Sequence, residues 1–486
     1  MRIGRVGTAL SAIALLAGCG GGGSSGGGGT GSVTPPNTGG TPPPPSSTTA
    51  GCSLRERQDW VTAQMSEWYL FPETLPGSPN PSGFSTVEAY LDSLTATARS
   101  QGRDRFFTYL TSIAEENAYY NSGASAGFGF RLSYDTANRR VFVAETFEGT
   151  AALAANIDRG TEILAVGTTS GNLQLVSDLM AGANGPQTVT NALGPPDPGV
   201  TRVLRVRDPN GVTREVTISK TDYELTPVSS RYGAKILDDG GRKVGYVNLR
   251  TFINTADPKL RAAFAQFKAA GVTQVIVDVR YNGGGLVSIA ELMGDLLGGN
   301  RSTAEVFSYT TFRPSKSQYN ETRNFAPKAE SIAPMKIAFI GTGGSASASE
   351  LVINAFIPYL GTNMALVGSN TYGKPVGQIA LDRSACDDRL RVIAFATQNA
   401  AKQGDYYQGL ASKVPNSCQA ADDITKPLGD PAEASVARAL DFLAGRSCTP
   451  ITSALAAKSI RPEEGPRQLL SPERPSTAQR EVPGLF

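Results

Sequence analysis

The sequence contains no histidine in its 486 residues. This absence excludes a Ser-His-Asp catalytic triad, a HExxH zinc site and a haem held by histidine. Acid-base chemistry must therefore use lysine, aspartate, glutamate, tyrosine or cysteine. The sequence also lacks an excess of either charge, with 45 Lys and Arg against 43 Asp and Glu. A near-neutral surface gives no electrostatic reason to expect a nucleic acid or an anionic membrane as partner.

Long apolar runs are also missing, apart from a short one in the N-terminal segment MRIGRVGTALSAIALLAGCG. Two arginines before a short apolar stretch are typical of a secretory leader. Leu16-Ala17-Gly18-Cys19 resembles a bacterial lipobox, in which Cys19 is the lipid anchor; a plain signal peptide with a chance cysteine is the alternative. We expect residues 1–19 to be a lipoprotein signal peptide and residues 20–51, rich in Gly, Ser, Thr and Pro, to be a tether. These features predict a periplasmic protein that contacts the outer membrane through its lipid only.

Cysteine is scarce, and four of the five cysteines lie beyond the leader: Cys52, Cys386, Cys418 and Cys448. An even number in an oxidising compartment favours disulfides, and four cysteines permit three pairings. We expect Cys386 to pair with Cys418, closing a polar excursion, and Cys52 with Cys448, tying together the two ends of the folded part. Free buried thiols are the alternative.

Two small domains are predicted before the main one. Residues 52–122 place Trp60, Met65 and Trp68 at helical spacing and are interpreted as a small helical domain. Residues 123–223 contain short alternating runs, a short helical pattern and turn signals, which indicate a β-rich module.

The β-rich module opens with the glycine loop Gly127-Phe128-Gly129-Phe130. With this loop at its start, the module resembles a PDZ domain. Backbone N–H groups of such a loop can hold a terminal carboxylate while the peptide adds a strand to the sheet edge. The alternative is a structural hairpin turn with aromatic packing.

Residues 224–448 alternate strand and helix patterns, as in VGYVNLRTF, DPKLRAAFAQFKAAG and VTQVIVDVR. This βαβ pattern predicts a mixed α/β fold with a partly parallel sheet. Residues 449–486, rich in Pro, Ser, Arg and Glu, are predicted to be a disordered tail.

Two serine contexts are candidates for a nucleophile. GASAG around Ser125 fits the GxSxG pattern, but it lacks the preceding strand, the following helix and the histidine that this elbow requires. GTGGSASASE instead lies between the apolar run MKIAFI and the helix-like run ELVINAFIPYL. Its serines should stand at a helix start, where free N–H groups and the positive end of the dipole favour an oxyanion.

Without histidine, a serine can be activated by a lysine whose burial makes the ammonium form unstable. Lowering a lysine pKa from about 10.4 to about 8 costs roughly 3 kcal/mol, which a largely apolar site can impose. The candidate is Lys374 in SNTYGKPVGQ, directly after the strand-like run MALVG. A surface lysine is the alternative.

GSASASE followed by YGKPVGQ resembles the C-terminal processing peptidases, also called tail-specific proteases. This resemblance implies that Ser347 is the nucleophile, Lys374 the general base, and Gln378 the residue that orients the lysine. DVRYNGGGL resembles the DLRNNPGG segment of that family, with Gly283 in place of proline. The N–H groups of Gly284 and Ala348 would then be the oxyanion donors.

Other residues near these motifs are given supporting roles. Asp278 and Arg280 are interpreted as structural, and Glu350 as a helix-start carboxylate or a group that supports the site. Phosphate binding by the DVRYNGGGL loop is disfavoured because the GK[ST] ending of a P-loop is missing.

The resemblance implies a ClpP-crotonase-like catalytic core with a PDZ-like domain and a small N-terminal helical domain. The implied activity is a serine endopeptidase that cleaves unstructured C-terminal regions of protein substrates, with no metal and no cofactor. The alternative is a catalytically inactive, PDZ-like adaptor lipoprotein. A crotonase-type acyl-CoA enzyme conflicts with the export signal. The sequence carries no signal for the oligomeric state.

Overall fold

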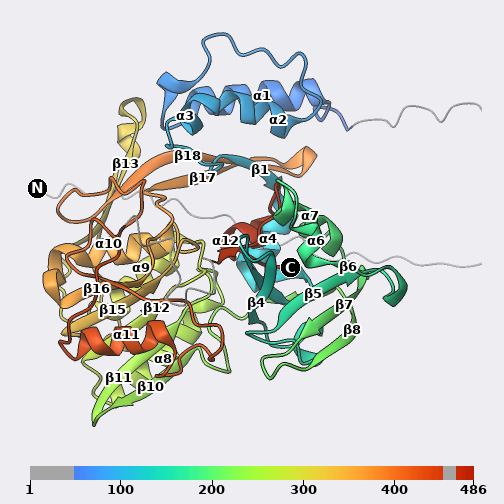
Figure 1. The fold of residues 1–486 in the computed structure, drawn as a ribbon. Coiled ribbons are helices and arrows are strands. Elements are labelled where there is room, and N and C mark those ends of the chain that lie inside the picture. The colour runs from blue at the N-terminus through green and yellow to red at the C-terminus, as the bar shows by residue number, and fades with distance from the viewer. Residues whose placement is uncertain (1–48, 453–466) are drawn as a thin grey trace, which may run out of the picture. The chain divides into compact units, whose positions relative to one another are not determined.

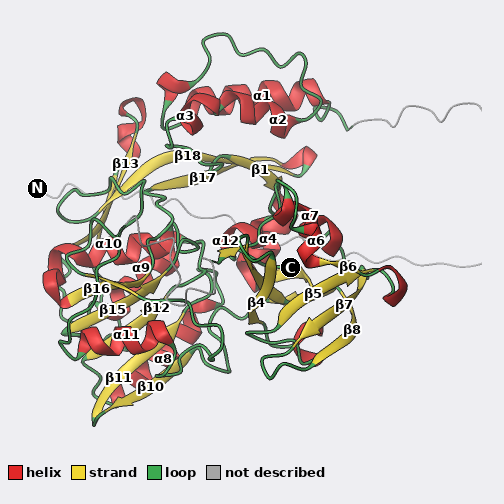
Figure 2. Ribbon diagram, viewed as in Figure 1, coloured by secondary structure: helices red, strands yellow, loops and turns green. Residues whose placement is uncertain are grey.

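The computed structural model describes residues 49–452 and 467–486 (Figures 1 and 2). The predicted signal peptide, the lipid-anchor residue Cys19 and nearly all of the predicted tether lie outside these residues. Within the described ranges, no helix combines the length and the apolar character needed to cross a membrane.

The first folded segment packs three helices and a short 3-10 turn on a sheet. These are α1 (Leu54–Trp68), η1 (Pro72–Thr74), α2 (Val87–Leu94) and α3 (Ala96–Ser100). Ser53 begins α1 with a capping box, in which its hydroxyl accepts from Glu56 N and the Glu56 carboxylate accepts from Ser53 N. Val61 and Met65 of α1 are buried against Val392 and Ile393 of the sheet below.

The sequence predicts a helical domain over residues 52–122, but the structure also has a strand near the end of this range. β1 (Tyr109–Ser112) pairs antiparallel with β18 (Asp388–Gln398), and α4 (Ile113–Ser122) follows it. β18 also pairs with β17 (Val376–Arg383) and β13 (Val306–Phe312), and β13 pairs with β14 (Glu321–Asn324) beside η3 (Pro314–Tyr319). Strands that lie far apart in the sequence thus share one sheet.

The β-rich module contains a sheet in the order β20-β3-β4-β5-β7-β8, with β6 added to β5. Its elements are β3 (Phe130–Asp135), β4 (Arg140–Thr146), α5 (Ala151–Ala154), β5 (Glu162–Gly167), η2 (Ser170–Asn172), β6 (Gln174–Leu175), α6 (Val176–Leu179), α7 (Gly185–Leu193), β7 (Thr201–Arg207) and β8 (Thr213–Ser219). A separate ladder joins β2 (Ala124–Gly127) to β9 (Thr221–Glu224). Phe128 and Phe130 of the glycine loop are fully buried in the core of this module.

The largest domain is built on a six-stranded sheet in the order β10-β11-β12-β15-β16-β19. The strands are β10 (Ala234–Asp239), β11 (Arg242–Asn248), β12 (Gln274–Asp278), β15 (Lys336–Gly341), β16 (Met364–Gly368) and β19 (Ser417–Gln419). All pairs from β11 to β19 are parallel, and β10 is antiparallel to β11. The predicted mixed α/β fold is confirmed.

Helices cover both faces of this sheet. α8 (Ala256–Ala269), α9 (Val287–Leu297) and α10 (Ala348–Leu360) pack on one face, where Val275 and Val277 are buried. α11 (Ala434–Leu443) covers the other face, where Ile276 is buried. The alternation follows the two-residue period of a strand, and burial on both faces explains the continuous apolar run VIV. Short 3-10 turns follow α10 and β17: η4 (Gly361–Asn363) and η5 (Ser384–Cys386).

The predicted disorder of residues 449–486 is wrong for residues 467–486. This segment forms β20 (Gln468–Leu469), which pairs with β3, and α12 (Thr477–Glu481), which contacts α4. In Figure 1, α12 is the dark red helix beside α4. The composition is polar, but four of its apolar side chains, Leu470, Val482, Leu485 and Phe486, are buried on surfaces that the rest of the chain provides.

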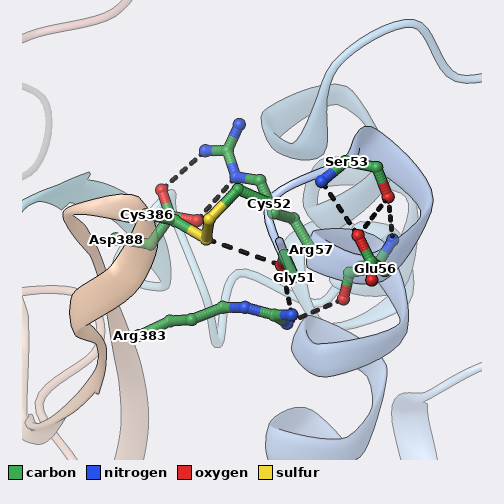
Figure 3. The surroundings of a disulfide bond; sticks show 8 residues. All are labelled: Gly51, Cys52, Ser53, Glu56, Arg57, Arg383, Cys386 and Asp388. Carbon is green, nitrogen blue, oxygen red and sulfur yellow. Dashed lines mark hydrogen bonds and ion pairs between the residues drawn. A yellow bond between two sulfur atoms is a disulfide. The ribbon is translucent and has the colours of Figure 1, made fainter. Parts of the chain in front are cut away.

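The predicted disulfide pairings are also wrong. Cys52 pairs with Cys386, and Cys418 pairs with Cys448. Cys386 lies at the turn between β17 and β18, which reaches the residues before α1 (Figure 3). Arg383 donates to the carbonyls of Gly51 and Glu56 there. The sequence pattern did not show that the helical segment rests on this hairpin.

The disulfide between Cys418 and Cys448 joins strand β19 of the large sheet to the residues that follow helix α11. Cys418 lies on β19, and Cys448 follows α11 on the same apolar face. Gln419 N donates to Thr449 O at 2.7 Å, which holds the two backbones side by side.

Candidate active site

The three serines of GGSASASE lie where β15 ends and α10 begins, at the carboxyl edge of the parallel sheet. Two of them are structural. Ser345 Oγ donates to Val279 O at 2.7 Å, and Ser349 Oγ donates to Asn282 O at 3.0 Å. Both side chains are fully buried, so they fasten the serine loop to the neighbouring glycine loop.

Ser347 differs from its two neighbours. It is partly exposed, and no carbonyl in the described part of the chain accepts a hydrogen bond from its hydroxyl. It is the N-cap of α10 and has φ 55° and ψ −114°, in a region that non-glycine residues rarely adopt. Such strain persists where the surroundings impose it and is common at functional positions.

Lys374 lies in the loop between β16 and β17. Its Nζ donates to Gln378 Oε1 at 2.9 Å and is 5.2 Å from the centre of the Phe107 ring. Burial lowers the pKa of the Lys374 amine, while the nearby carboxylate of Glu481 raises it. A desolvated lysine with a lowered pKa can supply neutral amine as a base.

Gln378 is held by a residue that the sequence motifs did not indicate. Its Nε2 donates to the carbonyl of Phe107, which leaves Oε1 facing the lysine amine. The Phe107 loop is fixed in turn by buried Asp104, whose Oδ1 accepts from Phe107 N at 2.8 Å and from Thr108 N at 3.2 Å. The first folded segment therefore completes the surroundings of the lysine.

Glu350 connects the serine loop to the lysine loop. Its side chain is fully buried, and its oxygens accept from Ser347 N at 3.1 Å, Gly373 N at 2.7 Å and Lys374 N at 2.7 Å. Ser347 N and Lys374 N bind the same oxygen, Oε2. Burial raises the pKa of Glu350, and these backbone donors oppose the rise. The structure thus places the predicted nucleophile and base on one shared carboxylate.

The glycine loop passes directly beside Ser347. Gly284 has φ 126°, and a Cβ added there would lie 2.8 Å from the Ser347 Cβ and 3.3 Å from Ala348 N. Ala348 is the first residue of α10, a position whose N–H has no partner inside the helix. The N–H of Gly284 donates to Asn282 Oδ1 at 3.0 Å. Of the two predicted oxyanion donors, Gly284 is therefore already bonded and must share or exchange its partner to serve.

Asp278 and Arg280 form a buried ion-pair network behind this loop. Arg280 Nε donates to Asp278 Oδ1 at 3.0 Å, and its Nη2 donates to Glu433 Oε2 at 2.9 Å. All three side chains are completely buried. The network joins the end of β12 to the start of α11.

The glycine loop of the β-rich module also has bonded N–H groups. Gly129 N and Phe130 N donate to Phe486 O at 2.9 and 3.3 Å. Gly127 lies so close to Phe486 that an added Cβ would be 2.7 Å from its carbonyl carbon. The rejected candidate Ser125 lies inside strand β2, with no helix start after it. The loop thus combines aromatic packing with strand-like bonding to another segment.

A cavity of about 1920 Å³ joins these features. Its lining includes Lys374, Ala346, Gly283, Glu481 and Phe486. It therefore extends from the lysine past the serine and glycine loops to the β-rich module.

Comparison with known proteins identifies two matching family models. Residues 243–402 match the model of peptidase family S41, and residues 56–109 match the peptidase S41 N-terminal domain. The first range contains Ser347, Lys374 and Gln378, and the second contains Phe107.

Curated relatives match across the central part of the chain. The chain is 27% identical over 273 residues to the chloroplastic C-terminal processing peptidase of Tetradesmus obliquus, a match that covers 54% of each. It is 23% identical over 269 residues to the carboxyl-terminal-processing protease of Synechocystis, covering 54% of this chain and 56% of that protein. The chain spans about half the length of the curated relatives it matches.

A crystal structure of a Bacteroides fragilis protein assigned to the S41 proteases is similar in fold. It superposes with a TM-score of 0.61 at 21% identity and covers 79% of this chain and 97% of that one.

Proposed function

Residues 56–109 and 243–402 belong to peptidase family S41, and from this premise we propose that the protein is a serine endopeptidase with a Ser347–Lys374 dyad. The observation that carries the proposal is the shared carboxylate of Glu350, which binds the backbone of both residues beside the cavity that Lys374 and Ala346 line. Ser347 is also the one serine of the three whose hydroxyl is not used to hold a backbone carbonyl.

In the proposed reaction, the neutral Lys374 amine removes the proton from Ser347 Oγ as this oxygen attacks the carbonyl carbon of the scissile bond. Gln378 accepts from the amine and keeps it aimed. The developing oxyanion binds the N–H of Ala348 at the start of α10, together with that of Gly284 once it turns from Asn282. Lys374 then gives its proton to the leaving amine, and the acyl-enzyme is hydrolysed by a water that Lys374 deprotonates.

We further propose that the β-rich module acts as a PDZ-like domain for unstructured C-terminal regions of protein substrates. Its glycine loop already bonds a strand-like segment through Gly129 and Phe130, which supports peptide binding at this edge. The proposed site of action is the periplasm, with a lipid anchor at Cys19 in the outer membrane. The two disulfides support an oxidising compartment.

The test is hydrolysis of a permanently unfolded protein by the parent, Ser347→Ala and Lys374→Ala between pH 6 and 10. Lys259→Ala, which removes an exposed lysine, is the matched control. We expect the parent and the control to cut, the two site variants to be inactive, and the rate to rise with pH. Activity that survives in Lys374→Ala would refute the assignment of the base.

The rival function is a peptide-binding adaptor without catalysis. Peptide binding by the parent with no cleavage at any pH would favour it.

A further inference from the structure

The 467–486 segment, defined as residues 467–486, completes the free edge of strand β3. β4 pairs with one edge of β3, and the segment pairs with β3 as well. Gln468 and Leu469 pair with Tyr134 and Ser133. Further along β3, Leu132 N donates to Gly484 O at 2.7 Å. The segment thus binds as an added strand, which is how sheet-edge domains bind peptides.

Two apolar side chains anchor the end of the segment. Phe486 is 5% exposed and packs in the core of the β-rich module with Phe128 and Phe130. Phe486 N also donates to Phe130 O at 3.0 Å. Leu485 is 2% exposed and packs in a different cluster with Tyr119. Alternate side chains therefore enter different apolar clusters, as expected for a strand.

The same segment reaches the loop beside Ser347. Gly283 N donates to Glu481 O at 2.9 Å, and a Cβ at Gly283 would lie 2.2 Å from Arg480 O. The next residue, Gly284, is in contact with Ser347. One chain segment therefore contacts both the proposed peptide groove and the loop of the proposed oxyanion site.

The segment also changes the charge around the proposed base. The charged groups around Lys374 are Glu481 and Arg480 on α12, Asp104 in the Phe107 loop and Arg391 on β18. Glu481 is buried, and its Oε1 accepts from Tyr120 OH at 3.0 Å. Its carboxylate raises the pKa of the lysine amine and so favours the ammonium form, which cannot act as a base.

We propose that the 467–486 segment is an intramolecular ligand that occupies the peptide groove of the β-rich module and covers the glycine loop of the active site, so that a substrate must displace it. The effect of the segment on catalysis rests on the proposed function. The binding of the segment to strand β3 follows from the contacts alone. It predicts a latent enzyme whose resting state is closed by its own chain.

The expected size of the effect follows from competition within one molecule. A tethered ligand has an effective concentration on the order of 1 mM. For a free peptide with a Kd on the order of 10 μM, such a competitor lowers the apparent affinity about 100-fold. A substitution that weakens binding of the segment should therefore restore much of the lost affinity for the free peptide.

The test measures binding of a fluorescein-labelled peptide with the sequence of residues 477–486, TAQREVPGLF, by fluorescence anisotropy. All proteins carry Ser347→Ala, so binding is independent of cleavage. We compare the otherwise unchanged chain with Phe486→Ser, which removes one anchor. Glu473→Ala is the matched control, because this exposed side chain lies on the same segment and is not one of its buried apolar anchors.

We expect Phe486→Ser to bind the peptide at least about tenfold more tightly than the unchanged chain and the control. Backbone amides of Gly129, Phe130 and Leu132 should exchange with solvent faster in this variant, because they bond to the segment. A deletion of residues 467–486 should bind most tightly. If the deletion does not fold, the point variant still decides the question.

Equal peptide affinity in the unchanged chain and Phe486→Ser, with unchanged amide exchange, would overturn the inference. Measurement of cleavage with Ser347 restored separates it from the proposed function. If Phe486→Ser binds the peptide more tightly but no form of the protein cleaves, the segment is an intramolecular ligand and the proposed peptidase activity is wrong. If the unchanged chain and Phe486→Ser cleave at equal rates and bind the peptide with equal affinity, the protein is a peptidase and the 467–486 segment is not an intramolecular ligand.

Discussion

Replacing Glu350 by glutamine tests whether one carboxylate aligns the proposed nucleophile and base. Glutamine has nearly the same shape, but one of its two terminal atoms is an NH₂ donor. If the NH₂ takes the Oε1 position, Gly373 N loses its acceptor; if it takes the Oε2 position, Ser347 N and Lys374 N both lose theirs. At least one buried backbone N–H therefore faces another donor.

The magnitude follows from the number of bonds lost. A hydrogen bond to a charged group contributes about 1.5 to 3 kcal/mol, and removal of the buried charge offsets part of this loss. We expect the free energy of unfolding to fall by about 1 to 3 kcal/mol. A shift of about 1 Å in the serine or the lysine loop can lower the rate about 100-fold, so kcat should fall strongly while KM changes little.

The assay combines steady-state cleavage of an unstructured peptide with urea unfolding of the same samples. Glu224→Gln, at an exposed position on β9, is the matched control. A merely structural role of Glu350 would lower stability and leave kcat of the folded fraction unchanged. Glu350→Gln with parental kcat and a parental pH profile would refute the positioning argument.

Three further predictions concern charge and covalent linkage. Glu481→Gln removes a carboxylate that raises the pKa of Lys374, so the amine should lose its proton at lower pH and the rise in cleavage rate should move to lower pH; an unchanged or alkaline-shifted profile would contradict this. Arg280→Met leaves two buried carboxylates without their cation and should cost about 3 to 5 kcal/mol in urea unfolding, whereas Arg438→Met at a more exposed ion pair should cost less than about 1 kcal/mol. Cys386→Ser opens a bridge with a sequence separation of 334 and should lower stability by about 3 to 5 kcal/mol, more than Cys448→Ser, which opens one of 30; the reverse order would show that loop length is not decisive.

The sequence predicted the parts of the site that depend on local pattern. An apolar strand followed by small residues and a helix-like run places Ser347 at a strand-to-helix junction, and the structure has it there. The same reasoning placed Lys374 after the neighbouring strand β16. Such positions follow from the periodicity of a parallel sheet, in which carboxyl ends gather at one edge.

Features that depend on contacts between distant segments could not be predicted in this way. The carbonyl of Phe107 that holds Gln378 is 271 residues away in sequence, and no local pattern marks a backbone acceptor. The disulfide pairing was missed because it depends on the hairpin of β17 and β18 reaching α1. The order of residues 467–486 was missed because a few apolar side chains scattered in a polar stretch give no periodic signal.

The contact between Gln378 and Phe107 has a consequence for the order in which the protein matures. During synthesis from the N-terminus, the Phe107 loop is made long before the lysine loop. The Phe107 carbonyl can therefore bind Gln378 only after most of the chain has been made. The bridge between Cys52 and Cys386 crosses the same two regions and closes only where thiols are oxidised. We therefore expect alignment of the lysine to come late in folding, after both of these distant regions have been made.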